Sequence, residues 1–518
     1  MSFTVITAAR IFCSLLFLSS VPIVSIVTCA SAAEIALDVE VGFRGVFQLG
    51  RPFPIKVEVN NQGPAVEGTV EATVWQGSAV KGGGAFPVYH RRRIFVGAGA
   101  RKSASFTIDP GAISRPLLVA FHSPRASAAR EIDLRRHFTP APLFLLLTES
   151  GLASVPALAG ALNPLISVSP EELPSVADAY GGVASVVLYE PSLRELSGAQ
   201  NAALDAWLAS GGRIVALGSA HYAPYQEPAL GRFLPVRVSG LKNFPSLSAV
   251  EKAYGAPPSA LKNVAAQDAK LVEGKAVIEE EGSPILVEAS RAKGKILYLA
   301  LDLGRPPLSL WEGRARLFRE LVAPAGESKG TPPPAWDDAI FSQLFLGRAV
   351  TAGYVPIGAF FSWTVFYLAG LGLLTWLWQG RRLGGRGLAL CFLSLVVAAS
   401  AGGYLYLSRG GRIPDGVLVT STLLEPVADG YVEASTNAAL FSTQKREYVL
   451  TVEKGWSGFA PLARRAGAPE ENALVVEEEG SRPRFRALWK QWDYRLFRVR
   501  SITRFPVRVE LDTQPNER

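Results

Sequence analysis

Two long uncharged segments constrain this chain more than any other feature of its sequence. No residue from Ala349 to Gly380 is charged, and a second uncharged run follows at Gly387–Leu407. An α-helix rises about 1.5 Å per residue, so each run is long enough to cross the ~30 Å apolar core of a bilayer. Core helices of soluble proteins rarely run this far without charge, which favours membrane helices over buried ones. We therefore predict transmembrane helices at 350–378 and 387–407.

The first 33 residues have the features of a secretory signal. An apolar run follows Arg10 and ends in Ala30 and Ala32, an A-x-A cleavage pattern. The apolar part is long, so an uncleaved anchor is an alternative, and a lipid attached to Cys29 is a weaker one. In each case the chain from residue 34 onward leaves the cytoplasm.

The segment 379–386 between the two predicted helices is too short for anything but a hairpin loop. It carries Arg381, Arg382 and Arg386, which suits the cytoplasmic face. Arginines also flank the outer ends of the helices, so the charge rule alone does not fix the orientation. The signal does, and it places the regions before and after the hairpin outside the cytoplasm. We expect a multi-pass protein of the bacterial cytoplasmic membrane.

Composition excludes several kinds of site. Cysteine occurs only at Cys13, Cys29 and Cys391, all in apolar segments. The predicted soluble regions therefore lack disulfides, thiolate metal sites and a cysteine nucleophile. The four histidines show no ligand spacing, so we predict no metal site and no cofactor. A net charge of +8 over 518 residues is modest, and we expect no nucleic-acid partner.

Residues 34–139 alternate apolar and polar side chains in short runs. Ile35–Val41 and Pro54–Val59 are examples, and turn-forming residues such as Asn60 to Pro64 separate the runs. Strands of this length and spacing predict a β-sandwich domain. The pattern resembles immunoglobulin-like modules of bacterial surface proteins.

The pattern changes at Pro140 to that of an α/β domain, which we assign to 140–326. Leu143–Leu147 is continuously apolar, as expected of a strand buried on both faces. A helix is predicted after Ser197, which forms a capping box with Gln200, and it ends at Gly211. Strand–helix–strand order predicts a doubly wound parallel sheet. Residues 240–282 interrupt this order and are predicted to be an insertion.

Several segments of this domain carry a family resemblance. They are Leu173-Pro174, Ser185 to Leu188, Leu196 to Trp207, Gly211 to Arg213, Gly218, Gly294 to Asp302, Pro306-Pro307, Trp311 and Gly313. Together they resemble the class I glutamine amidotransferase-like domain found in large bacterial membrane proteins of unassigned function. The resemblance implies a flavodoxin-like sheet. It also implies envelope membrane proteins as partners, with proteins that carry von Willebrand A-type domains as candidates.

Amidotransferases use a cysteine on a tight strand-to-helix turn, and this domain has no cysteine. We therefore expect no glutaminase activity. Ser219 and His221 follow a predicted strand, where α/β sheets place their ligands, and Asp302 follows another. A serine and a histidine two residues apart rarely form a nucleophile–base pair. The three residues are therefore predicted to be ligand or partner contacts, and a hydrolase using Ser219 and His221 is the alternative.

A proline-rich linker at 327–349 leads into the membrane, and the hairpin is followed by a second β-rich domain at 408–518. Near its end, basic residues alternate with aromatic ones. The candidates for membrane or partner contact are Arg484, Arg486, Trp489, Lys490, Trp492, Arg495, Arg498 and Arg500. Arginine and aromatic side chains both suit a bilayer boundary. The polar faces of ordinary strands would give the same pattern.

These observations predict a multi-domain protein of α/β and β regions on a two-helix membrane hairpin. We expect a binding or scaffold component of the cell envelope, not an enzyme, whose degenerate amidotransferase-like domain serves recognition.

Overall fold

The fold comes from a computed structural model. It describes residues 35–76, 86–111, 113–148, 162–191, 193–194, 196–254, 261–323, 357–380, 385–409, 416–426, 431–442, 444–451, 456–461, 473–477, 484–490 and 493–504. The signal-like segment, the linker at 327–349, the loop at 381–384 and Trp492 lie outside these residues. The described part is a strand-rich α/β protein with several sheets, few helices and two long apolar helices.

The N-terminal β region consists of two facing sheets. Three antiparallel strands form one sheet in the order β1 (Ile35–Val41), β3 (Phe53–Asn61) and β6 (Arg101–Ile108). The second sheet contains β5 (Phe86–Val96), β4 (Val66–Gln76), β7 (Leu117–His122) and β8 (Ser127–Ile132). Alternate residues of β3, such as Ile55 and Val57, are fully buried because a strand turns every second side chain to the same face. These side chains share one core with the second sheet.

The α/β domain is built on a seven-stranded sheet. Five strands are parallel: β11 (Leu165–Val168), β10 (Leu143–Leu147), β12 (Val183–Tyr189), β13 (Arg213–Leu217) and β18 (Gly294–Leu299). The strands β17 (Ser283–Arg291) and β16 (Lys275–Glu280) extend it antiparallel. Helix α2 (Gly198–Ala209) connects β12 to β13, and α5 (Arg314–Val322) follows β18. All five residues of β10 are buried, as its apolar run predicts.

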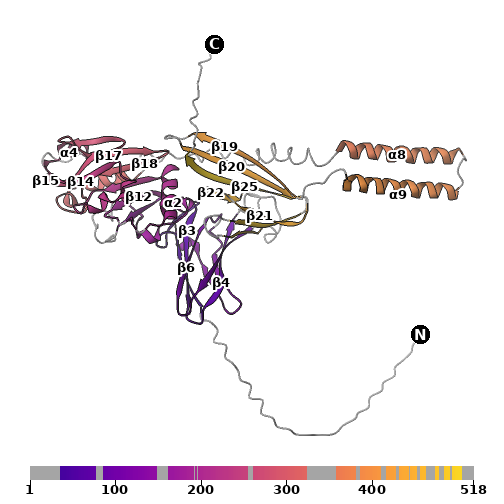
Figure 1. The fold of residues 1–518 in the computed structure, drawn as a ribbon, viewed down its shortest axis with the longest axis horizontal. Helices are drawn as coiled ribbons and strands as arrows, with labels where there is room; N and C mark the ends of the chain where they lie inside the picture. The colour runs from indigo at the N-terminus through magenta and orange to yellow at the C-terminus, as the bar shows by residue number, and fades with distance from the viewer. Residues whose placement is uncertain are drawn as a thin grey trace, which may run out of the picture.

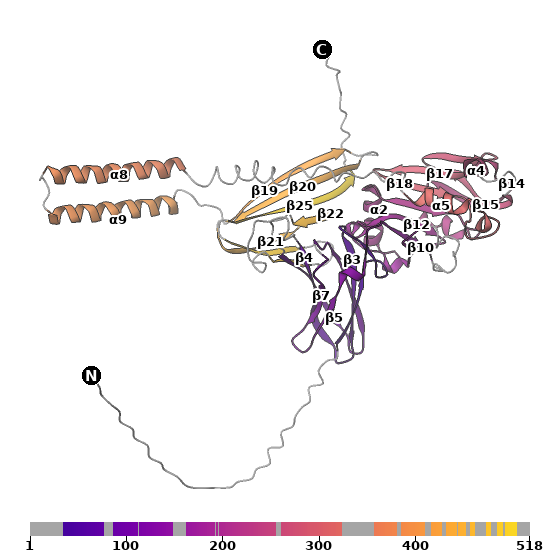
Figure 2. The ribbon, with the colours of Figure 1, turned by 180° about the vertical axis from the view of Figure 1, so that it is seen from behind.

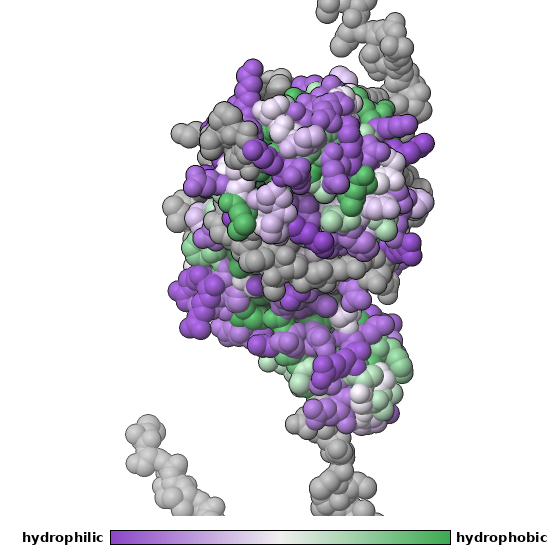
Figure 3. All heavy atoms as spheres, turned by 90° about the vertical axis from the view of Figure 1, so that its left-hand side faces the viewer, coloured by the Kyte–Doolittle hydropathy of each residue, from purple (hydrophilic) through white to green (hydrophobic). Residues whose placement is uncertain are grey.

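The predicted insertion at 240–282 does not form a separate unit. Its first part pairs as β14 (Val236–Ser246) with β15 (Lys262–Leu271), linked through α4 (Ser248–Tyr254). Its last part is β16, which belongs to the main sheet. The sheet is therefore mixed and not wholly parallel, because β16 and β17 form a hairpin at its edge. Figure 3 shows the end of the molecule that carries α4, β14 and β15 as mainly hydrophilic, with scattered apolar side chains.

The C-terminal region returns from the hairpin and completes the N-terminal β region. β23 (Leu474–Glu477) pairs parallel with β5, and β24 (Arg484–Trp489) and β21 (Arg446–Thr451) continue the same sheet. Leu474, Val476 and Trp489 join the N-terminal core. The other C-terminal strands form a separate sheet: β19 (Gly416–Pro426), β20 (Tyr431–Ser442), β25 (Asp493–Arg504) and β22 (Trp456–Pro461). Two regions that the sequence analysis divided thus share a sheet and a core.

The remaining helices, α8 (Ile357–Gln379) and α9 (Gly385–Arg409), extend side by side from the β-rich body, with the α/β domain at the opposite end (Figures 1 and 2). Both are long and apolar enough to cross a membrane, and their apolar stretches are not buried by the rest of the chain. Gly402 makes room for the indole of Trp363 between the helices.

The N-terminal β region and the α/β domain also pack together directly. Phe43, from the loop after β1, enters the α/β core and lies 6.2 Å from the Tyr180 ring. Arg44 forms an ion pair with Glu172 at 2.7 Å. The strands β2 (Phe47–Gln48) and β9 (Phe138–Thr139) pair in parallel between the two regions. This packing holds the regions in a defined arrangement.

Candidate functional site

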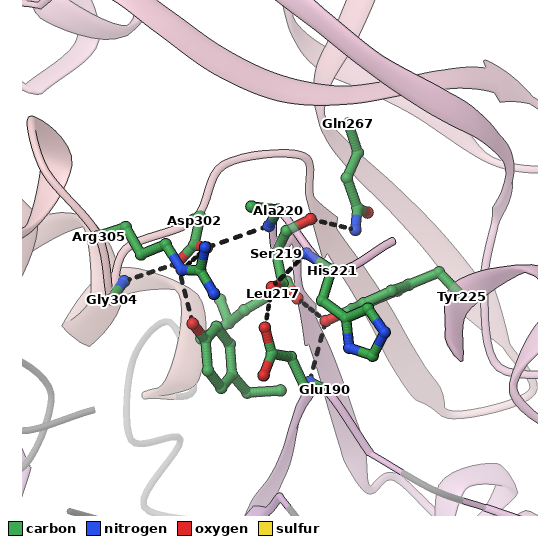
Figure 4. Close-up of polar contacts among 11 residues, drawn as sticks. Glu190, Leu217, Ser219, Ala220, His221, Tyr225, Gln267, Asp302, Gly304 and Arg305 are labelled. Carbon is green, nitrogen blue, oxygen red and sulfur yellow. Dashed lines mark hydrogen bonds and ion pairs between the residues drawn. The ribbon is translucent and has the colours of Figure 1, made fainter. Parts of the chain in front are cut away.

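A polar cluster lies at the carboxyl ends of three adjacent parallel strands, the edge where α/β sheets place their ligands (Figure 4). Glu190 directly follows β12, Ser219 follows β13, and Asp302 follows β18. The topology therefore brings together residues that are far apart in the sequence. Two of the three, Ser219 and Asp302, are contacts predicted from the sequence.

Glu190 occupies a left-handed backbone conformation, with φ of 47°. This region is uncommon for residues other than glycine and marks a sharp turn at the end of the strand. The backbone N–H of Glu190 donates to the Tyr225 hydroxyl at 3.2 Å, and that hydroxyl donates to the Leu217 carbonyl. The turn is thus fixed by a tyrosine that is 2% exposed.

The Ser219 hydroxyl lies inside the cluster. Its residue is 1% exposed, and the hydroxyl donates to the carboxylate of Glu190. The backbone N–H of His221 donates to the Ser219 hydroxyl oxygen at 3.0 Å. The Gln267 side chain donates to the Ser219 carbonyl at 3.0 Å. Tyr298 in turn donates to Gln267 at 2.8 Å, so a buried hydrogen-bond chain fixes the loop.

The imidazole of His221, the base in the alternative hydrolase hypothesis, does not bond to the Ser219 hydroxyl. His221 is exposed, and the bond to Ser219 comes from its backbone (Figure 4). Within the described part of the chain, no hydrogen bond of the imidazole is recorded. The group that accepts the hydrogen bond from the Ser219 hydroxyl is the Glu190 carboxylate.

Asp302 organises the neighbouring loop. One carboxylate oxygen accepts the Tyr189 hydroxyl at 3.0 Å and the Gly304 backbone at 3.0 Å, while the other accepts the Ala220 backbone at 3.1 Å. Arg305 lies 3.6 Å from the carboxylate. Asp302 is 7% exposed, and its bonds tie the loop after β18 to the loop after β13. Burial, reinforced by the charge of Asp302, raises the pKa of the Tyr189 phenol, so it stays a neutral donor.

Glu190 was missed by the sequence analysis. The available signal was its place immediately after the apolar run Val183–Tyr189, at the end of a predicted strand. No sequence rule favours glutamate in a left-handed conformation, so the turn could not be predicted from residue type. Within the residues that the structure describes, no group of three or more His, Cys, Asp or Glu side chains is arranged to hold a metal ion.

The C-terminal basic residues separate into buried and exposed groups. Trp489 is fully buried and donates to the Leu440 carbonyl at 3.1 Å. The Arg495 guanidinium lies over the Trp489 ring and donates to the Leu488 carbonyl at 2.7 Å. Both side chains are therefore unavailable for membrane contact in this fold.

Arg486 and Arg498 are half-buried and bonded within the sheets, to Glu477 and Asn437. The exposed members of the predicted set are Arg484, Lys490 and Arg500. The predicted membrane contact can therefore rest on these three, while Trp492 lies outside the described residues.

One family model and several solved structures match parts of this chain. A family model described as "Domain of unknown function (DUF8726)" matches residues 34–135. No curated protein matches the sequence. Among solved structures, exo-β-1,4-mannosidase Op5Man5 from Opitutaceae bacterium strain TAV5 aligns at 11% identity and a TM-score of 0.25, over 37% of each chain.

A GH42 β-galactosidase, Gan42B from G. stearothermophilus, aligns at 10% identity and a TM-score of 0.24, over 70% of this chain and 41% of that one. The CARDB domain of the PF1109 protein from Pyrococcus furiosus aligns at 15% identity and a TM-score of 0.14, over 19% of this chain and 87% of that one. This chain thus spans about 37–41% of the length of the two glycosidases.

Proposed function

We propose that this chain is a non-catalytic, membrane-anchored binding or scaffold component of the bacterial cell envelope. Its α/β domain, in this proposal, is a degenerate amidotransferase-like unit that serves recognition. The single observation that carries the proposal is the state of Ser219, because its hydroxyl is buried and already bonded to Glu190 and the His221 backbone. A nucleophile needs access to its substrate, and a 1% exposed serine has little.

The surroundings of Glu190 support the amidotransferase-like part of the proposal. In this proposal, the sharp turn at Glu190 corresponds to the strand end where such a domain needs its cysteine, with glutamate in its place. A carboxylate at this turn can accept hydrogen bonds from a ligand, but it cannot replace a thiolate in glutamine hydrolysis. Retained geometry without the nucleophile is what a domain converted to binding would have.

The pairing of β23 with β5 supports the proposed topology. The two strands lie on opposite sides of the hairpin in the sequence, yet they hydrogen-bond in one sheet. Strands in one sheet must lie on the same side of a membrane, so the chain between them crosses an even number of times. Helices α8 and α9 supply two crossings. With the predicted signal at the N-terminus, both regions would lie outside the cytoplasm.

One observation favours a second candidate, an extracytoplasmic hydrolase. The Ser219 hydroxyl has a proton acceptor in Glu190, which could act as the base that His221 does not provide. Such an enzyme would need the loop after β13 to open before a substrate could reach Ser219.

Turnover by the full-length protein in lipid nanodiscs, on panels of esters and amides, separates the two candidates. If the chain is a binding component, the wild type gives no turnover above background, and the Ser219→Ala and Glu190→Gln variants give the same background. His221→Ala is the matched control on the same loop. Turnover that both Ser219→Ala and Glu190→Gln abolish, with His221→Ala unaffected, would establish the hydrolase instead.

A further inference from the structure

A cleft of about 1090 Å³ lies where three parts of the chain meet, away from the Glu190 and Ser219 cluster. The N-terminal sheets contribute Lys56, Arg92 and the outer side of β6. The α/β domain contributes residues before and within α2, including Asp178 and Gln200. The strands β23 and β24 supply apolar side chains at the third wall. Clefts at junctions of domains are frequent binding sites.

One wall of the cleft is the edge of β6 that no other described strand pairs with. The Asn61 backbone N–H donates to the Ala100 carbonyl at 3.0 Å, and this bond fixes which residues of β6 turn their backbone toward β3. Backbone groups alternate in an antiparallel pair, so Lys102, Ala104, Phe106 and Ile108 face β3. Arg101, Ser103, Ser105 and Thr107 face the other way.

These outward backbone groups open into the cleft. Ser103, Ser105 and Thr107 line it, together with Val88 and Val476 from strands β5 and β23 of the other sheet. The Ser105 carbonyl accepts a hydrogen bond from the Arg92 side chain at 3.3 Å. Within the described part of the chain, the other outward N–H and C=O groups of these three residues have no hydrogen-bond partner. A row of unpaired backbone groups at a sheet edge is a template for another strand.

We propose that the β6 edge in this cleft is the docking site for an extended polypeptide segment of a partner protein. The segment would add a strand beside β6 and extend the β1–β3–β6 sheet. The proposal goes beyond the function proposed above, because it concerns a different surface and does not depend on the α/β site.

The spacing and chemistry of the edge favour a polypeptide over other ligands. The outward groups recur at every second residue, about 7 Å apart, which matches the repeat of a strand. The side chains at Ser103, Ser105 and Thr107 are short, so they leave room for a neighbouring backbone. Charges of both signs line the cleft, such as Lys56 and Asp109, so backbone pairing and not one charge would select the ligand.

The same β region already accepts a strand from a distant part of the chain. β23 lies almost four hundred residues after β5 in the sequence and pairs with it in parallel over Leu474–Glu477. Edge addition is therefore a mode of assembly that this β region uses, and β6 is the neighbouring edge that faces the cleft.

Selection of peptides from a displayed random library on the full-length protein in nanodiscs tests the proposal. Ser105→Pro removes an outward N–H and places the ring where an added strand would lie, without removing a bond to β3. Ser105→Ala is the matched control, because it removes the hydroxyl and keeps the backbone edge. Recovered peptides should bind Ser105→Ala like wild type and Ser105→Pro about tenfold more weakly or worse.

Hydrogen exchange provides a second measurement that does not require the proline variant to fold. Bound peptide should slow exchange of the wild-type amides of Ser103, Ser105 and Thr107 and leave those of β10 unchanged. Failure to recover any peptide would overturn the proposal. So would equal binding to a folded Ser105→Pro variant, or unchanged exchange along β6 when peptide is bound.

Discussion

At the scale of single residues, acidic side chains hold loops and strands of the α/β domain together. Asp302 accepts bonds from two loops, and Glu190 fixes the Ser219 hydroxyl. Glu288, on β17, forms an ion pair at 2.7 Å with Lys295 of β18 and lies 3.9 Å from Lys275 of β16. It therefore connects the three strands at one edge of the large sheet.

The hydrogen bond from Lys295 and its charge lower the pKa of Glu288 below the ordinary value of 4.5. A carboxyl group whose pKa is lowered in the folded state adds stability above its unfolded pKa and loses it as the pH falls through the folded one. Glu288→Gln should therefore lower the free energy of unfolding by about 0.5–1 kcal/mol at pH 7. The difference from wild type should shrink as the pH falls below 4.5 and vanish once the pH lies below the lowered pKa of the folded state.

Urea unfolding at several pH values measures this difference. Glu279→Gln is the matched control, because Glu279 is an exposed residue of the adjacent strand β16 with no recorded ion pair among the described residues. It should match the wild type throughout. A Glu288→Gln deficit that does not shrink as the pH falls below 4.5 would contradict the assigned role of the charge.

At this scale, the position of a residue at a strand end can be predicted where it follows a strong apolar pattern. Ser219 and Asp302 both follow apolar strand segments, and both lie in the cluster. The sequence pattern could not supply Glu190, because the left-handed turn depends on the Tyr225 hydroxyl, 35 residues away in the sequence. The alternative hydrolase paired Ser219 with His221 because they are close in the chain, whereas the backbone turn leaves the His221 side chain exposed.

At the scale of elements, the C-terminal strands show why residue type alone misleads. Basic and aromatic side chains alternate along β24 and β25, a pattern that suits a membrane boundary and an ordinary half-buried strand equally. Phe485 and Trp489 are buried while Arg484 is exposed, so the period-2 alternation of the strand decides which side chains are accessible. The side of β24 that becomes buried is set by its pairing with β23, which joins it to the β5 sheet over the N-terminal core, and the local sequence does not reveal this pairing.

Charge reversal at Arg495 and at Arg500, on the same strand β25, should change the stability of the protein by very different amounts. Arg495 is 7% exposed and bonded to the carbonyls of Leu488 and Ala473, whereas Arg500 is exposed. Arg495→Glu would bury an unpaired carboxylate beside carbonyl oxygens and should cost about 3 kcal/mol or more. Arg500→Glu should change stability by less than about 0.5 kcal/mol.

Thermal melting of the two variants in the same detergent provides the comparison. Arg495→Met, which keeps the length of the side chain without charge, should fall between them. Equal melting temperatures for Arg495→Glu and Arg500→Glu would contradict the burial of Arg495. A lipid-binding assay with Arg495 replaced would therefore report unfolding and not a lost surface contact, so such an assay should use Arg484, Lys490 and Arg500.

At the scale of the whole molecule, the sequence predicted the order of the regions but not their association. The two apolar helices, the N-terminal strands and the α/β pattern were each evident locally, because hydrophobic periodicity is a local property. The parallel pairing of β23 with β5 is not local, and four residues of β23 carry little signal. The C-terminal region was therefore predicted to be a separate domain, whereas its strands β21, β23 and β24 complete a sheet of the N-terminal region.

This association predicts that the N-terminal β region depends on the end of the chain. A chain that stops at Arg409 lacks β23 and β24, which leaves one edge of β5 unpaired and exposes core side chains such as Val88. Burial contributes about 25 cal/mol per Å² of apolar surface, so the loss should be several kcal/mol. Hydrogen exchange should accelerate at Val88–Arg91, while amides of β12 in the α/β domain should exchange as in the full chain.

Supplying residues 411–518 as a separate fragment tests pairing and topology together. The two regions can meet only in one compartment, and the proposed orientation puts both outside the cytoplasm. Co-expression with a signal peptide on the fragment should restore protease resistance of the N-terminal region in spheroplasts, because β23 can then reach β5. The same fragment without a signal peptide should leave that region sensitive. Restoration by the cytoplasmic fragment would reverse the orientation, and a truncated chain with full resistance and unchanged exchange at Val88–Arg91 would refute the dependence on β23.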